Sequence, residues 1–119
     1  MEYEMIFEVS QKYTAKELGS GTLLVLGTPG LIAMVEHVCM NAIEKDLGTE
    51  HTSVGSFIDI NHIRPSLMGA LIKVEVALTH TDGKSFDFDY KAYEGEKLIA
   101  TGKHSRVKVN VMKFMERIK

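Results

Sequence analysis

The chain has 119 residues, of which 45% are hydrophobic and 25% charged, and its net charge is −2 at neutral pH. A chain of this length suits one domain with one core, so we expect a single domain over residues 1–119. The slightly acidic composition argues against nucleic acid as the main partner, because phosphate binding requires a basic surface.

The N-terminal segment, MEYEMIFEVSQKY, predicts a first strand, because Met5, Phe7 and Val9 recur at every second position. It is acidic and lacks the basic and apolar regions of a signal peptide. No stretch of the sequence approaches the roughly 18 apolar residues of a membrane span. Cys39 is the only cysteine, which excludes an intrachain disulfide and argues against a secreted scaffold. We therefore expect a cytoplasmic protein with no membrane partner.

A long helix is predicted from about Pro29 to Leu47, after the bend LGSGT and the run LLVLG, which is a strand or a turn-bounded loop. Thr28 is a typical N-cap, Pro29 suits the first helical position and Gly48 supplies a stop. The helix is apolar almost all round. We therefore expect it to be wrapped by a sheet on one side and a second subunit on the other.

Four further segments predict strands: VGSFIDINHI, LIKVEVALTHT, KSFDFDYKAYE and LIATGKHSRVKVNV. Asp82-Gly83 is a hairpin signal between the second and third of these. In the third, the aromatic residues from Phe86 to Tyr90 share one face with Ala92. The last residues, MKFMERIK, suit a helical turn or a strand extension. The predicted fold class is α+β: a strand, one long helix and a meander of about four antiparallel strands.

Glu36 is an unusual residue on the predicted helix. Its neighbours three and four positions away are Ile32, Ala33, Cys39 and Met40, none of which can pair with a carboxylate. Burying an unpaired charge costs several kcal/mol, so a buried carboxylate without partners would take up a proton instead. Glu36 is therefore expected at a water-filled mouth, or with partners from elsewhere, such as a capped backbone or an ion pair at an interface.

His62 ends an apolar row of its predicted strand, where it either forms a hydrogen bond in the core or faces a cleft. It can pair with a carboxylate from the helix. Thr28 stands at the helix N-terminus, where the free N–H groups of Gly30 and Leu31 can hold a carbonyl oxygen that becomes negative during acyl transfer. Gly30 and Gly55 lack side chains, so a ligand can approach their backbone closely.

Other signals in the sequence are weaker. Arg64 follows His62 closely, and Arg106 shares a strand face with His104. The basic C-terminal run KHSRVKVNVMKFMERIK, interrupted by Glu116, suits a solvated strand face, although contact with one anionic ligand remains open. The sequence has no zinc pattern, P-loop or dinucleotide fingerprint, so we expect no metal or bound cofactor. The mid-helix cysteine is expected to be an inert core thiol.

Three segments, GTPGLIAMVEHV, VGSFIDINHIRPSLMG and ATGKHSRVKV, together resemble the hotdog-fold thioesterases, and most closely the branch containing fluoroacetyl-CoA thioesterase. The resemblance implies a hotdog fold, in which a mostly antiparallel sheet of about five strands wraps one long central helix. It also implies a homodimer, or a dimer of dimers, whose sheets join side by side and whose active sites lie at the subunit interface.

The same resemblance implies hydrolysis of an acyl-CoA thioester by Thr28, Glu36 and His62. Gly55 matches a glycine whose backbone N–H lies near the thioester carbonyl, and Arg106 matches an arginine of the family's G-x-H-x-R motif. His62, oriented by Glu36, would act as general base toward Thr28 or a water. The CoA moiety is part of the substrate, so no separate cofactor is implied.

The resemblance leaves the substrate and its contacts open. Arg64, Arg106 and the C-terminal lysines are candidates for contact with the CoA phosphates. The stretch TAKELGSGTLLVLG is shorter than in the fluoroacetyl-specific enzyme and lacks its aromatic lid, which argues against selectivity for fluoroacetate. The alternative function is a non-catalytic module that binds acyl-CoA or an acyl carrier on the same fold. A hydratase is a weaker alternative, because the required Asp/His arrangement is not found.

Overall fold

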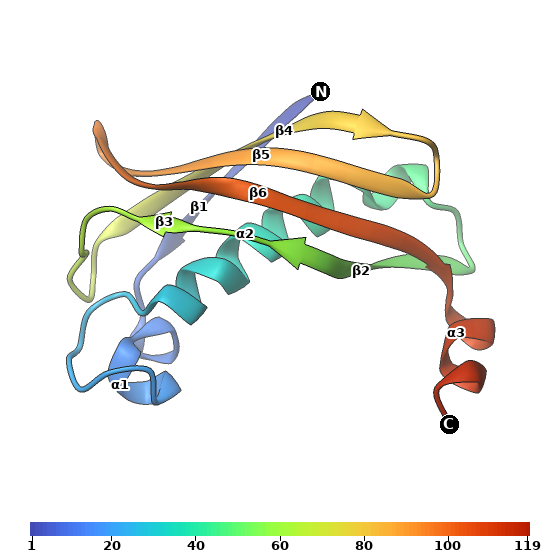
Figure 1. Cartoon of the computed structure of the whole chain (residues 1–119). Coiled ribbons are helices and arrows are strands. Elements are labelled where there is room, and N and C mark those ends of the chain that lie inside the picture. Colours follow the sequence, from blue (N-terminus) through green and yellow to red (C-terminus); the bar gives the residue numbers. More distant parts are fainter.

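The computed structural model describes residues 1–119, as a curved antiparallel sheet that arches over one long helix (Figure 1). The strands are β1 (Glu2–Glu8), β2 (His51–Ile58), β3 (Asn61–His62), β4 (Leu71–Thr81), β5 (Ser85–Glu94) and β6 (Lys97–Asn110). The helices are α1 (Ala15–Leu18), α2 (Thr28–Ile43) and α3 (Val111–Arg117), with 3-10 turns η1 (Gln11–Tyr13) and η2 (Glu44–Asp46). The strand order is β1-β4-β5-β6-β2, and β3 also pairs with β6. The α+β prediction is confirmed.

The sheet follows the predicted alternation of apolar residues. In β5, Phe86, Phe88, Tyr90 and Ala92 are buried, as predicted. The β4–β5 hairpin is also confirmed: the strands pair, and the Asp82 carboxylate in the turn accepts hydrogen bonds from the backbone N–H groups of Lys84 and Ser85. These buried faces meet α2 in a single core cluster.

Helix α2 begins one residue earlier than expected. Gly27, not Thr28, is its N-cap, and Thr28 is the first helical residue, so the Thr28 hydroxyl does not cap a helix amide. Pro29 fits the first turn, where its missing N–H costs no helical hydrogen bond. The α-helix ends at Ile43 and tightens into η2, which explains why the pattern continued to Leu47.

One side of α2 packs on the sheet through Leu31, Val35, Val38, Cys39 and other fully buried residues. The opposite side is only partly covered: Ala33 and His37 are exposed, and Glu36 is half-buried. One protomer therefore does not wrap the helix completely. The second subunit expected from the sequence stays a prediction.

The run LLVLG, for which the sequence left a strand or a turn-bounded loop open, is a loop with two isolated bridges, Thr14 to Leu26 and Val25 to Leu67. The predicted strand VGSFIDINHI is divided into β2 and β3, with a bulge after Gly55. Asp59 lies in the break, where its carbonyl accepts a hydrogen bond from the Tyr90 hydroxyl, and this interruption carries no signal in the alternation.

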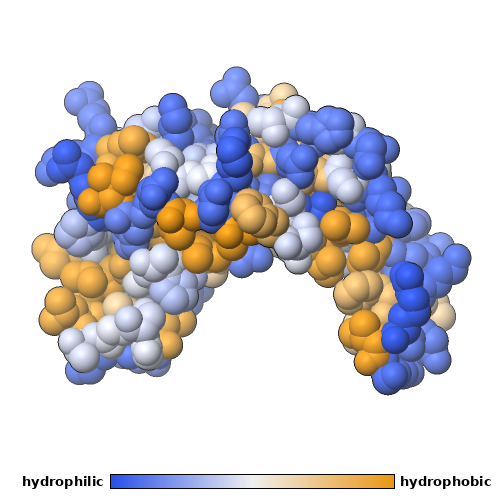
Figure 2. All heavy atoms as spheres, in the orientation of Figure 1, coloured by the Kyte–Doolittle hydropathy of each residue, from blue (hydrophilic) through white to orange (hydrophobic).

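The C-terminal segment forms a helical turn, α3, rather than extending β6. Its start is fixed by Asn110, whose side-chain oxygen accepts a hydrogen bond from the backbone N–H of Lys113. Figure 2 shows a hollow beneath the sheet, flanked by the α1 segment and by α3, and apolar residues lie on both projecting ends. None of the helices has the length and apolar character needed to cross a bilayer.

The contact between Gly30 and the backbone of Tyr13 fixes the start of α2 against η1, because a Cβ at Gly30 would overlap the Tyr13 carbonyl oxygen. We expect Gly30→Ala to lower the free energy of unfolding by about 1–3 kcal/mol, measured by urea denaturation. Ala33→Ser, at an exposed position of the same helix, is the control and should change it by less than about 0.5 kcal/mol. Equal stability of the two variants would contradict this close packing.

Candidate active site

The Thr28 hydroxyl and the His62 imidazole are in contact, with Oγ1 and Nδ1 2.8 Å apart. Thr28 lies at the exposed start of α2, and half-buried His62 lies on β3. Strand β3 is held against β6 by the pairing of His62 with Ala100. The structure thus brings together two of the three predicted catalytic residues, from segments far apart in the sequence.

The protonation state of His62 suits a base. Burial lowers the pKa of the His62 imidazole below its ordinary value, and the backbone of Arg64 opposes this effect more weakly. A neutral ring can accept the hydroxyl proton of Thr28 at Nδ1 and carry its own proton on Nε2. His62 Nε2 is buried and has no hydrogen-bond partner within the protomer. A buried ring nitrogen of this kind requires a partner, which a water, a substrate or another subunit can supply.

Glu36 does not orient His62 within the protomer, which corrects the pairing expected from the sequence. No hydrogen bond joins the two side chains. Thr28 and Glu36 are eight residues apart on α2, or about 12 Å along the helix axis. An imidazole that contacts the start of the helix is therefore too far along it to reach Glu36 of the same chain.

The Glu36 carboxylate instead lies beside β2 and β6. A Cβ built on Gly55 would be 2.9 Å from Glu36 Oε2, 3.3 Å from His104 Cε1 and 3.7 Å from Arg106 Nη1. Glycine at position 55 therefore leaves room for the carboxylate, the imidazole and the guanidinium. Gly55 itself is exposed and stands next to the bulge of β2.

Arg106 is buried, with 6% of its surface exposed, and it binds the strand next to it. Its Nε donates to Ser53 Oγ at 2.8 Å and its Nη2 donates to the Ser53 carbonyl at 2.9 Å. Burial lowers the pKa of the guanidinium, and the Glu36 carboxylate opposes that shift. The expected contact of Arg106 with CoA phosphates is not supported, because the side chain is turned inward and fastens β6 to β2.

His104, for which no role was predicted, extends this network. Its Nδ1 lies 2.7 Å from the Phe57 carbonyl, to which it can only donate, so Nε2 accepts from Arg106 Nη1 at 3.2 Å. Burial lowers the pKa of His104, which agrees with a neutral ring. Phe57 lies just after the bulge, so the network fixes the backbone beside Gly55. In the sequence, the only indication of this contact is that His104 and Arg106 are two residues apart on a strand and therefore share a face.

The backbone N–H groups of Gly30 and Leu31, predicted to be free to bind a carbonyl oxygen, are less accessible than expected. The N–H of Leu31 donates to the Gly27 carbonyl at 3.0 Å, which makes it part of the helix. The space beside Gly30 is occupied by the backbone of Tyr13. Both residues are buried, so direct substrate binding by Gly30 or Leu31 is not supported. The positive end of the helix dipole still faces the Thr28 hydroxyl.

Thr28 and His62 line a cavity of about 390 Å³ between the α1 loop and the segment after β3. Arg64 lines the same cavity, as does Ser20, for which the sequence predicted no role. Arg64 is exposed and therefore free to meet an anionic group at the mouth. The cavity thus combines a hydroxyl, a neutral imidazole and one cation.

Cys39 adds no reactive group to this site. Cys39 is fully buried, and burial raises the pKa of its thiol to about 12, so it remains a protonated core residue as expected. No group of three or more histidine, cysteine, aspartate or glutamate side chains is arranged to hold a metal ion. The polar groups that remain for chemistry are those around Thr28, His62 and Glu36.

Comparison with known proteins relates the chain to a family of thioesterases. The family model of FlK, described as fluoroacetyl-CoA-specific thioesterase, matches residues 9–112. The structure of fluoroacetyl-CoA thioesterase FlK is similar to this one, with a TM-score of 0.94 at 21% identity, over 99% of this chain and 92% of that chain. No curated protein matches the sequence.

Two further structures are similar. For a hot-dog-like protein from Thermanaerovibrio acidaminovorans, the TM-score is 0.89 at 19% identity, over 99% of this chain and 87% of that chain. For a thioesterase superfamily member from Thermus thermophilus, the TM-score is 0.86 at 22% identity, over 99% of this chain and 90% of that chain. At these identities the similarity shows the fold, and the predicted hotdog fold is confirmed.

The arginine network generates a stability prediction. Arg106→Lys removes the fork that binds both Ser53 groups and leaves buried polar atoms without partners, so the free energy of unfolding should fall by about 1–3 kcal/mol. Arg64→Lys is the matched control at an exposed position and should change stability by less than about 0.5 kcal/mol. The measurement is chemical denaturation of both variants. A loss of the same size in both would show that Arg106 does not fasten the strands.

Proposed function

The chain belongs to the fluoroacetyl-CoA-specific thioesterase family, and from this premise we propose that it is an acyl-CoA thioesterase whose reaction depends on Thr28, His62 and Glu36. The observation that carries the proposal is the 2.8 Å contact between the Thr28 hydroxyl and His62 Nδ1, at the start of α2 and in a cavity. A hydroxyl held by a neutral imidazole is the arrangement that acyl transfer requires of a nucleophile and its base.

In this mechanism His62 accepts a proton from Thr28, or from a water in the same position, as the oxygen attacks the thioester carbonyl. The carbonyl oxygen becomes negative, and the positive end of the α2 dipole beside Thr28 stabilises it, together with the N–H of Gly55 of the partner subunit, since Gly55 lies with Glu36. Collapse of this intermediate breaks the C–S bond, and the CoA thiolate leaves with the proton held by His62. If Thr28 attacked, a water then releases the acid by the same sequence of proton transfers.

Glu36 enters this mechanism through a second copy of the chain. We place Glu36 of the partner subunit against the unpaired Nε2 of His62, where a carboxylate holds the ring and stabilises its protonated form. Three features support a dimer: β2 is an edge strand of the sheet, Phe57 on it is 54% exposed, and the outer side of α2 is partly uncovered. Two antiparallel copies of α2 bring residue 36 of one beside residue 28 of the other.

Release of thiol from a panel of short and long acyl-CoAs tests the activity. The wild type should hydrolyse at least one of them, and His62→Ala should reduce kcat on that substrate by about 100-fold or more, since the general base is lost. The base must be neutral, so kcat/KM should fall as the pH decreases through the pKa of His62, which burial lowers and the carboxylate of the partner subunit raises. Equal thiol release by wild type and His62→Ala on every substrate would instead favour a non-catalytic acyl-CoA or acyl-carrier binding module.

A complementation experiment tests the shared site. His62→Ala and Glu36→Gln should each be inactive alone, whereas a heterodimer with one chain of each kind should recover about half of the activity. It keeps one complete site, made by His62 of one chain and Glu36 of the other. The heterodimer is isolated with two affinity tags, and a tagged wild-type dimer gives the reference rate. A heterodimer as inactive as its parents would place the two residues in the same chain.

A further inference from the structure

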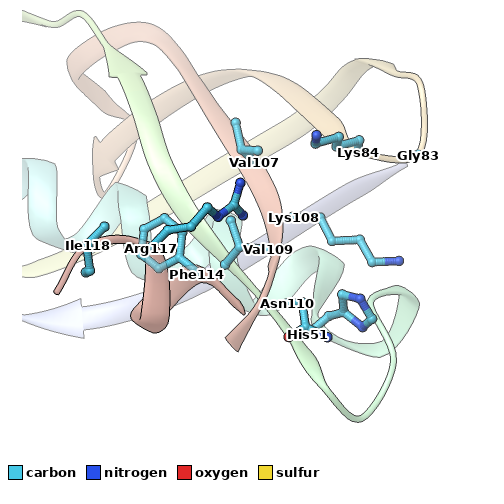
Figure 3. A pocket seen from close by; sticks show the side chains of 10 residues that line it. All are labelled: His51, Gly83, Lys84, Val107, Lys108, Val109, Asn110, Phe114, Arg117 and Ile118. Carbon is cyan, nitrogen blue, oxygen red and sulfur yellow. The ribbon is translucent and has the colours of Figure 1, made fainter. Parts of the chain in front are cut away.

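A second cavity lies at the end of the sheet where α3 begins, away from Thr28 and His62. It has a volume of about 700 Å³ and lies between the start of β2, the β4–β5 hairpin, the end of β6, and α3. Figure 3 shows the side chains that line it, with Lys84 from the hairpin, Lys108 from β6, and Arg117 and Phe114 from α3. We call this cavity the C-terminal groove.

The C-terminal groove is positively charged in a protein whose net charge is −2. Lys84, Lys108 and Arg117 line it together with His51, and no carboxylate does. The ion pairs of the structure are Lys73–Glu75, Lys103–Asp89 and Lys119–Glu116, so none of the three groove cations is paired. The nearby Asp82 carboxylate is occupied by backbone N–H groups of the hairpin. Unpaired cations grouped in a concave site attract anions.

The C-terminal groove has an apolar part as well as its cations. Phe114 is half-buried and is accompanied by Val107 and Val109 in the lining. An aromatic ring beside lysine and arginine side chains suits a ligand that joins a planar base to phosphates, since the base packs on the ring and the phosphates pair with the cations. A simple inorganic anion would leave this apolar part of the groove unused.

The groove lies close to Gly55 along the sheet. Gly55 pairs with Arg106, Ser53 pairs with Lys108, and His51 pairs with Asn110. Four residues of strand therefore separate Gly55 from the far end of the groove, or about 13 Å. In the shared site proposed above, Gly55 of one chain lies beside Thr28 and His62 of the other. A flexible arm that runs along β2 and β6 can therefore connect a thioester at Gly55 with phosphates at Lys108 of the same chain.

We propose that the C-terminal groove binds the nucleotide end of the acyl-CoA substrate, the adenosine 3′-phosphate 5′-diphosphate. Lys84, Lys108 and Arg117 pair with the phosphates, Phe114 packs against adenine, and the pantetheine arm follows β2 toward Gly55. This inference rests on the proposed thioesterase function. It gives the C-terminal residues, including α3, a role in substrate recognition that is separate from the chemistry at Thr28 and His62.

The test compares two substrates that carry the same acyl group, an acyl-CoA and the acyl N-acetylcysteamine thioester, which has no nucleotide. In Lys108→Glu/Arg117→Glu, the ratio of kcat/KM for acyl-CoA to kcat/KM for the short thioester should fall about tenfold or more, mainly through KM. Lys97→Glu, an exposed lysine at the opposite end of β6, is the matched control and should leave the ratio unchanged. An unchanged ratio in the double variant would overturn the proposal.

A binding measurement separates this inference from the proposed function. Adenosine 3′,5′-bisphosphate, titrated by calorimetry, should bind the wild type and bind the double variant about tenfold or more weakly. If the wild type hydrolyses neither thioester but binds this nucleotide in the groove, the thioesterase function fails and the nucleotide site stands. Equal binding by wild type and variant overturns the site. Lys108→Gln/Arg117→Gln replaces the double variant if the charge reversal unfolds the protein.

Light scattering, which measures the oligomeric state, tests whether a second copy of the chain occupies the groove instead of the nucleotide. Met112, Met115 and Ile118 of the C-terminal segment are exposed, so another copy of the chain is the competing partner for this end of the molecule. Under our proposal the double variant keeps the oligomeric state of the wild type. Dissociation of the double variant would assign the groove to a subunit interface and overturn the proposal.

Discussion

The hydrogen bond between the Thr28 hydroxyl and His62 Nδ1 is the interaction on which the candidate site depends. It requires a free hydroxyl at the start of α2, which the structure provides by using Gly27 as the N-cap. It also requires a fixed imidazole, and β3 supplies this because its two residues pair with the middle of β6. A change that shifts either element separates the pair, so the packing of the helix start against η1 is part of the site although it touches no reacting atom.

The sequence predicted the parts of the fold that repeat a simple pattern. The alternation of Phe86 to Ala92 identified the buried face of β5, and Asp82-Gly83 identified its hairpin, because both depend on neighbours in the sequence. The break between β2 and β3 was not predictable in this way, since it depends on a tertiary hydrogen bond from Tyr90 to the Asp59 carbonyl. The N-cap prediction for Thr28 was wrong for a related reason: threonine is a good N-cap in general, but here it is the first residue inside the helix, and its hydroxyl contacts His62.

The candidate site divides into two groups that sequence spacing could not distinguish. Thr28 and His62 form one group, and Glu36, Gly55, His104 and Arg106 form the other, about 12 Å along α2. The resemblance to thioesterases identified Thr28, Glu36 and His62 as a set, but a set of residues does not specify which chain each comes from. Nε2 of His62 has no hydrogen-bond partner within the protomer, and Glu36 is partly exposed beside His104 and Arg106, so the two groups do not meet in one chain.

The positive charges of this acidic protein are not spread evenly over its surface. The overall charge of −2 predicts no general affinity for nucleic acid, yet three unpaired cations line one cavity. Lys108 and Arg117 belong to the basic C-terminal run, which on sequence alone suits a solvated strand face, whereas Lys84 comes from a hairpin 24 residues before Lys108. Only the pairing of β5 with β6 brings the hairpin to the end of β6. A small acidic protein can therefore present one basic site matched to a single anionic ligand, because the sheet gathers cations that the sequence keeps apart.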